Sequence, residues 1–290
     1  MGVNERHLCD QGDRFMSATR RTFLRSTGLA AAAIGLARTG TLAATADDPW
    51  PDLARDAFNK RPINDGTGIL TVEMPYRAED ASIVPVTIRS ALAPGDERHV
   101  KAFTLVIDEN PAPVAATFAL GPNSGVASIA TRVRVDSYTN VHAVAELDDG
   151  KLYMVATYVK ASGGCSAPAA KNADEAIASL GQMRLRQFPP TDAAPASRPR
   201  EAQIMVRHPN NSGLQMNQVT RLYVPAFFIQ DLKVWQGDDL VFAMDGGISI
   251  SEDPSIRFSY TPNGATTLRV EARDTENHVF KGEWPVQAQM

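Results

Sequence analysis

Cysteine is nearly absent from this chain. The sequence has two cysteines in 290 residues, Cys9 and Cys165. We expect Cys9 to be lost with an N-terminal leader, which would leave the mature protein a single thiol. One thiol cannot form an internal disulfide. In an oxidising compartment Cys165 must therefore be buried and inert, paired with another molecule, or used chemically.

Several features that would indicate other functions are also missing. The formal net charge is −4 and no basic stretch is interleaved with aromatic residues, so we expect no nucleic-acid partner. The sequence shows no cofactor motif. The four histidines beyond the leader stand singly, without metal-ligand spacing, and are more simply surface or core residues: His99, His142, His208 and His278. We therefore expect neither a metal nor a cofactor.

The chain also lacks an apolar run long enough to stay in a bilayer. The apolar stretch at 29–37 is short and rich in alanine. It follows Thr-Arg-Arg-Thr-Phe-Leu-Arg at 19–25, which has the form of a twin-arginine motif, and precedes a small-residue cleavage site, Ala-Thr-Ala, at 44–46. We expect residues 1–46 to be a twin-arginine signal peptide, and the mature protein to lie in the periplasm without a membrane segment.

Short β-branched runs separated by turn residues make up most of the remaining sequence. They follow a short predicted helix at 52–58. The first series of predicted strands covers 69–74, 84–92, 100–107, 114–120, 126–135, 140–147 and 152–159. The second series covers 202–207, 226–235, 240–244, 255–260, 267–273 and 279–284. This pattern predicts an all-β protein with two immunoglobulin-like antiparallel β-sandwich domains.

Residues 166–200 interrupt the strand pattern. Within 171–186, four apolar residues fall on one face of a helix: Ala173, Ile177, Leu180 and Met183. The proline-rich stretch at 189–199 predicts an extended linker. The chain therefore divides into a leader at 1–46, a first domain at 47–165, a short helix and Pro-rich linker at 166–200, and a second domain at 201–290.

Cys165 lies where the first strand series ends, in Ala-Ser-Gly-Gly-Cys-Ser-Ala-Pro at 161–168. Gly163 and Gly164 are expected to form a flexible, exposed arm, because glycine has no Cβ and accepts positive φ. No histidine lies nearby in the sequence to act as a base, and no second thiol is present to resolve an adduct. These features favour a passive carrier thiol over a thiol-dependent enzyme.

The first domain resembles SoxY, the sulfur-carrier subunit of the periplasmic thiosulfate-oxidation system. The shared features are the leading helix, the immunoglobulin-like strand series, and a cysteine that follows two glycines after the last strand. The second domain resembles the partner subunit, SoxZ, through Arg-His-Pro at 207–209 and Pro-Ala-Phe-Phe-Ile at 225–229. The layout is similar to fused SoxYZ-like carriers that are encoded beside quinoprotein dehydrogenases.

The resemblance implies a non-catalytic protein that holds sulfur intermediates covalently on Cys165, with Gly163 and Gly164 as the arm. The implied partners are periplasmic sulfur-oxidation or quinoprotein dehydrogenase enzymes. In SoxY the motif ends the chain and glycine follows the cysteine. Here Ser-Ala-Pro follows at 166–168 and the chain continues, so the use of thiosulfate stays open.

The sequence leaves one functional alternative open. The protein would then be a binding or scaffold subunit of a periplasmic quinoprotein dehydrogenase system with a vestigial Cys165, because immunoglobulin-like sandwiches serve unrelated functions. Also open are the cargo, the identity of the partners, a disulfide-linked homodimer through Cys165, and whether Met1 or Met16 begins the chain.

Overall fold

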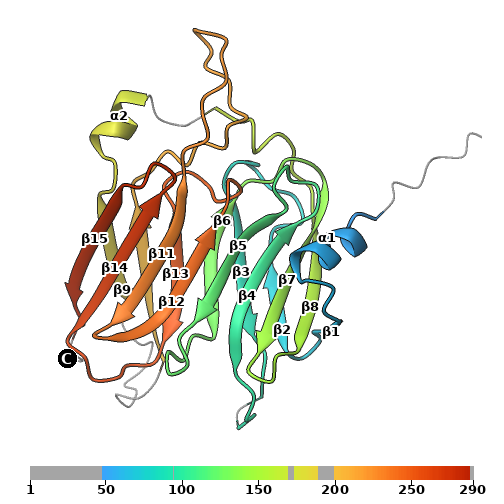
Figure 1. Cartoon of the computed structure of the whole chain (residues 1–290), viewed down its shortest axis with the longest axis vertical. Coiled ribbons are helices and arrows are strands. Elements are labelled where there is room, and N and C mark those ends of the chain that lie inside the picture. The colour runs from blue at the N-terminus through green and yellow to red at the C-terminus, as the bar shows by residue number, and fades with distance from the viewer. Residues whose placement is uncertain (1–47, 94, 169–172, 189–198, 288–290) are drawn as a thin grey trace, which may run out of the picture. The chain divides into compact units, whose positions relative to one another are not determined.

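Two β-sheets build the described part of the chain (Figure 1). The computed structural model describes residues 48–93, 95–168, 173–188 and 199–287. The predicted signal peptide at 1–46 and nearly all of the predicted linker at 189–199 lie outside these ranges. Within them, no helix is long and apolar enough to cross a membrane.

The larger sheet has nine strands in the order β1, β8, β7, β4, β5, β12, β11, β14, β15. Its neighbouring strands are antiparallel except β1 and β8, which run parallel. The strand bounds are Ile63–Asp65 (β1), Leu152–Val159 (β8), Thr139–Leu147 (β7), Val100–Ile107 (β4), Val114–Leu120 (β5), Asp239–Gly246 (β12), Ile229–Gln236 (β11), Thr267–Asp274 (β14) and Val279–Pro285 (β15).

The smaller sheet has six antiparallel strands in the order β2, β3, β6, β13, β10, β9. Their bounds are Leu70–Glu73 (β2), Val84–Ser90 (β3), Ser128–Val133 (β6), Ser255–Tyr260 (β13), Arg200–Val206 (β10) and Met183–Phe188 (β9). Alternate side chains of these strands join those of the larger sheet in one apolar core, as expected for a sandwich.

Helix α1 (Trp50–Ala57) covers the outer face of the larger sheet. It is anchored by Phe58, which packs with Val106 and Val144 on the side of the sheet opposite the main core. The Trp50 ring stacks on the buried His142 ring with their centroids 3.7 Å apart. The short helix was predicted at 52–58, close to its position in the structure.

The two halves of the chain join edge to edge in both sheets. In the larger sheet β5 of the first half pairs with β12 of the second, and in the smaller sheet β6 pairs with β13. The core continues across the junction, where the ring centroids of Phe118 and Phe242 are 6.1 Å apart. The predicted all-β fold with immunoglobulin-like halves is confirmed, and the structure adds that the halves share their sheets.

The helix predicted at 171–186 is wrong over its second part. Helix α2 spans only Ala173–Ala178, and Met183 begins strand β9. Gly181 lies between them with φ +73°, and its N–H donates to the Arg207 carbonyl at 2.8 Å. Met183 and Leu185 then pack against the core, so the segment follows the two-residue period of a strand.

Candidate functional site around Cys165

The segment that carries Cys165 is a tight turn packed against the first half. The N–H of Gly163 donates to the Asp136 carbonyl at 2.7 Å, and the N–H of Gly164 donates to the Val135 carbonyl at 3.0 Å. A Cβ on Gly164 would lie 2.1 Å from the carbonyl oxygen of Ala81. The second glycine therefore permits close backbone packing. In this conformation both glycines belong to an anchored turn, and their role as a flexible arm stays a prediction.

Cys165 itself is fully buried. Its exposed fraction is 0%, and it is a free thiol. Its backbone N–H donates to Oδ1 of Asp136 at 3.2 Å. The expectation of an exposed thiol is therefore contradicted, because the turn is anchored from the first half and covered from the second.

A loop of the second half closes over the turn. The Ser212 hydroxyl donates to the Cys165 carbonyl at 2.5 Å, and the Gln215 side-chain amide donates to the Ala167 carbonyl at 3.1 Å. The same Gln215 accepts a hydrogen bond from the Ser212 N–H at 3.0 Å. Both residues are buried. Two hydrogen bonds across the junction thus hold the cysteine segment in place, and a third within the loop links their donors.

Arg134 links the two halves beneath the turn. Its guanidinium donates from Nη1 to the Gly164 carbonyl at 3.3 Å and from Nη2 to the Asn210 carbonyl at 3.2 Å. The residue is only 1% exposed and its Nε has no hydrogen-bond partner. Burial lowers the pKa of Arg134, while the negative charges of Glu252 and Asp80 oppose that shift.

The surroundings keep the thiol protonated. Burial, followed by the negative charge of Asp136, raises the pKa of Cys165 to about 12, although the Arg134 guanidinium acts in the opposite direction. The thiolate is the reactive form of cysteine. In this closed conformation Cys165 is consequently a neutral and unreactive thiol, and any chemistry requires the turn to open.

The Arg-His-Pro motif shapes the closing loop. His208 is buried, with its ring centroid 4.4 Å from that of Phe227. Its Nδ1 accepts the Asn210 N–H at 3.1 Å, which places the Asn210 carbonyl that receives Arg134. Burial lowers the pKa of His208, with Asp274 acting against the shift. The motif therefore supports the site without contacting the thiol.

The other histidines lie away from Cys165. His142 hydrogen-bonds Asp108 at 2.9 Å beneath Trp50, His278 contacts Asp274 at 2.8 Å, and His99 is exposed. Within the described ranges, no group of three or more His, Cys, Asp or Glu residues is arranged to hold a metal ion.

The loop that closes the site continues into a projecting hairpin, seen above the sheets in Figure 1. Bridges between Asn211 and Phe227 and between Met216 and Tyr223 hold its two arms together. Its tip exposes apolar side chains, with Val219 91% and Leu222 68% exposed. The base of this hairpin contains Ser212, so the tip and the covering of Cys165 belong to one structural unit.

Sequence reasoning found Cys165 and its glycines but missed four residues that define their environment: Asp136, Arg134, Ser212 and Gln215. Arg134 follows the alternating strand β6, where its position predicts an outward side chain. Its burial depends on Gly164 and Asn210, which lie far away in the sequence. No local pattern could have revealed it.

Comparisons with known proteins agree with the two halves seen in the structure. Residues 54–165 match the family model of sulfur oxidation protein SoxY, and residues 188–285 match that of sulphur oxidation protein SoxZ. The first match ends at Cys165. A search of curated proteins gives no match to the chain.

Similar solved structures include the sulfur carrier protein SoxY from Chlorobium limicola f thiosulfatophilum. It is 24% identical, with a TM-score of 0.33, and the match covers 39% of this chain and 91% of that one. A superoxide reductase (neelaredoxin) from Ignicoccus hospitalis is 11% identical with a TM-score of 0.28, covering 31% of this chain and 78% of that one. The SoxY match covers the first half and the SoxZ match covers the second, and together they take up most of the described chain. The protein therefore belongs to the SoxY and SoxZ families as a fused SoxYZ-like chain.

Proposed function

We propose that this protein is a non-catalytic periplasmic carrier that holds sulfur intermediates on Cys165 and presents them to sulfur-oxidising partner enzymes. One observation carries the proposal. The SoxY match ends at Cys165, and the SoxZ-like half closes over that residue through Ser212 and Gln215. A thiol built into the junction of these two families fits carriage of sulfur better than catalysis, because no base hydrogen-bonds it among the described residues.

The burial of Cys165 fits a carrier that alternates between a closed and an open turn. In the closed turn the thiol is protonated and shielded from oxidation and from pairing with a second copy. In the open turn it regains an ordinary pKa of about 8.5 and reaches a partner. The hydrogen bonds to the carbonyls of Cys165 and Ala167 are the contacts that must break.

Loading can proceed as a sulfur transfer without net oxidation. The Cys165 thiolate attacks the terminal sulfur of a persulfide donor, R–S–S⁻, in the manner of thiol–disulfide exchange. A new S–S bond forms on Cys165, the S–S bond of the donor breaks, and R–S⁻ leaves with its electron pair. The product is a Cys165 persulfide that a partner can then oxidise or remove.

The scaffold alternative is favoured by the same burial. A fully buried thiol with a raised pKa is also what a vestigial cysteine would show. In that case the protein serves as a binding subunit of a periplasmic quinoprotein dehydrogenase system, and Cys165 never leaves the interior.

Incubation of the full chain with glutathione persulfide, followed by intact mass measurement, tests the proposal. We expect a mass increase of one sulfur atom that maps to Cys165 and is lost on reduction. Cys165→Ala serves as the control, since serine would place a hydroxyl at a fully buried position. A wild-type protein that stays unmodified while fully folded would favour the scaffold.

A further inference from the structure

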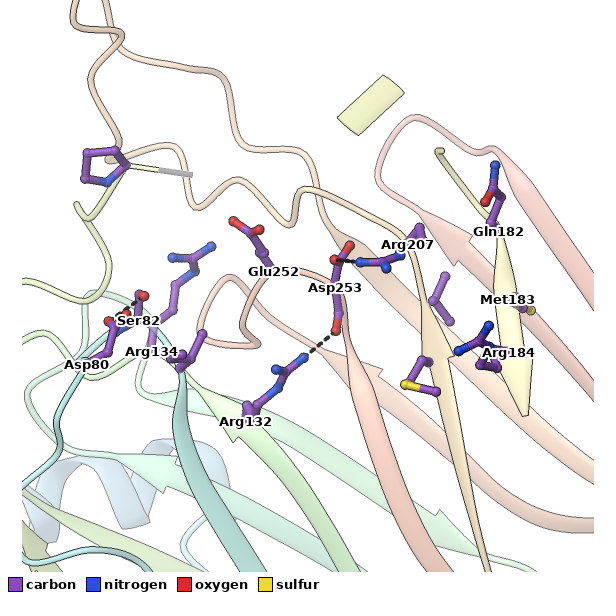
Figure 2. Close-up of a pocket in the computed structure, with 14 residues that line it drawn as sticks. Asp80, Ser82, Arg132, Arg134, Gln182, Met183, Arg184, Arg207, Glu252 and Asp253 are labelled. Atoms are coloured by element: carbon purple, nitrogen blue, oxygen red, sulfur yellow. Dashed lines mark hydrogen bonds and ion pairs between the residues drawn. The ribbon is translucent and has the colours of Figure 1, made fainter. Parts of the chain in front are cut away.

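A cleft lies beside the Cys165 turn, across the junction of the two halves (Figure 2). It has a volume of about 810 Å³ and is lined by strands of the smaller sheet and their connecting loops. Pro168, three residues after the cysteine, forms part of its wall, as does Arg134, which hydrogen-bonds the carbonyl of Gly164. Pro168 thus lines the cleft directly, and Gly164 is joined to it through Arg134.

Arginine dominates the polar lining of this cleft. Four arginines from the two halves line it: Arg132, Arg134, Arg184 and Arg207. Arg207 is paired with the Asp253 carboxylate, and Arg132 donates to the Asp253 carbonyl at 2.9 Å. Figure 2 shows these two contacts on the side of the cleft away from Arg134. The carboxylates of Asp80 and Glu252 also line the cleft, so its charges are partly balanced.

Arg134 is the one buried arginine of this lining in the described ranges, and the charges of Glu252 and Asp80 act on it without a direct ion pair. Its guanidinium contacts only backbone carbonyls, its Nε lacks a partner, and no carboxylate in the described ranges lies within ion-pair distance of it. A buried charge without a paired charge is costly. The nearby thiol of Cys165 does not offset that cost while it is neutral.

The geometry points to an anion site formed by Arg134 and the adjoining cleft, which binds the negatively charged end of the group carried on Cys165. This inference rests on the proposed carrier function and assigns to Arg134 the positioning of the charged end of a persulfide or an S-sulfonate. A charged group on Cys165 that extends away from Asp136 supplies a direct ion-pair partner for Arg134, whereas a neutral group does not. The closed turn therefore retains anionic cargo in preference to neutral cargo.

Two adducts of similar size but different charge test the site directly. Cys165 in the full chain is converted in mild denaturant to an S-sulfonate or to a neutral S-methylthio group, and the protein is refolded. Sulfite forms the first by displacing the thiol from a mixed disulfide, so that a new S–S bond replaces the old one. Excess dithiothreitol then removes each adduct, and intact mass follows its loss. The rate for the S-sulfonate is divided by the rate for the S-methylthio group, and this ratio is compared between variants.

Arg134→Met is expected to speed release of the S-sulfonate about tenfold relative to the S-methylthio group, because a buried charge loses its partner. Asp80→Asn tests the site without disturbing Arg134. Asp80 is an exposed residue of the cleft whose charge interacts with Arg134. Removing that charge should slow S-sulfonate release about two- to threefold relative to the neutral adduct.

Asp65→Asn is the matched control, because Asp65 accepts hydrogen bonds from the residue two positions later just as Asp80 does. It should leave the ratio unchanged. If Arg134→Met does not fold, Asp80→Asn decides the question alone. The anion site is overturned if this ratio of release rates is unchanged in the folded variants. It is also overturned if Asp80→Asn makes release of the S-sulfonate faster relative to the S-methylthio group. Because the adducts are installed chemically, that result leaves sulfur carriage itself untouched.

Discussion

The hydroxyl of Ser212 donates a 2.5 Å hydrogen bond to the backbone carbonyl of Cys165, across the junction of the two halves. The two residues are 47 positions apart and belong to different family matches. Gln215 adds a second contact, to the carbonyl of Ala167. Access to the thiol therefore depends on the position of one loop of the SoxZ-like half.

Replacing the closing side chains should expose the thiol. Ser212→Ala and Gln215→Ala each remove one hydrogen bond to the cysteine segment and one within the loop. The loss of the bond to the cysteine segment, worth about 1 kcal/mol, should raise the population of the open turn about fivefold. The rate of labelling by 5,5′-dithiobis(2-nitrobenzoate) measures this directly. Ser251→Ala is the control, since its buried hydroxyl also donates to a backbone carbonyl, that of Ser82, without contacting the cysteine segment. Equal rates in all three variants would show that the loop does not gate Cys165.

The pKa of Cys165 makes stability depend on pH in the alkaline range. The pKa is raised from 9.0 to about 12 on folding, so the folded state binds the thiol proton more tightly than the unfolded state does. This contribution is complete below pH 9 and is lost as the pH rises toward 12. The unfolding free energy of the wild type should fall more between about pH 8 and about pH 10.5 than that of Cys165→Ala. Urea titrations of both proteins at the two pH values measure this fall. An equal fall in the unfolding free energy of the two proteins would place the thiol in solvent.

The two glycines before Cys165 should respond differently to alanine. In Gly164→Ala the new Cβ would lie 2.1 Å from the Ala81 carbonyl oxygen, which should cost about 2–3 kcal/mol. In Gly163→Ala the nearest atom is 3.9 Å away, and the positive φ alone should cost about 1 kcal/mol. Denaturant unfolding at neutral pH distinguishes the two. If neither alanine changes the unfolding free energy, the two glycines form the flexible arm that the sequence predicts.

The shared sheets predict that the halves cannot be separated after folding. Cutting the chain at a protease site inserted within 189–198 leaves the pairing of β5 with β12 and of β6 with β13 intact. The fragments should therefore elute together in size-exclusion chromatography and separate only in denaturant. Fragments that part under native conditions would contradict a core continuous through Phe118 and Phe242.

Most strands could be predicted because they are short runs rich in β-branched residues, bounded by turn residues. The predicted ranges 100–107, 114–120, 152–159 and 255–260 coincide with β4, β5, β8 and β13. Strand β1 has only three residues, of which one is β-branched, too few to form such a run. Strand β9 was mistaken for helix because Met183 also continues the helical spacing of the residues before it, and only pairing with β10 makes it a strand.

Cys165 could be identified from the sequence because a solitary thiol after two glycines is a local feature. Its burial could not, since the covering residues Ser212 and Gln215 come from the other half. The pairing of strands between the two halves could not be predicted from the sequence either. Strand β5 is the last strand of the first half in the larger sheet, and its sequence does not indicate whether its free side faces solvent, pairs with another chain or pairs with β12.

Intact mass of the protein purified from the periplasm, with and without reductant, tests the central claim most directly. We predict a chain that begins after residue 46 and carries a reductant-sensitive addition of one or more sulfur atoms, or of a sulfonated sulfur group, on Cys165. The adduct should be absent from Cys165→Ala. A single unmodified mass that does not change after exposure to thiosulfate, sulfide and partner enzymes would contradict sulfur carriage.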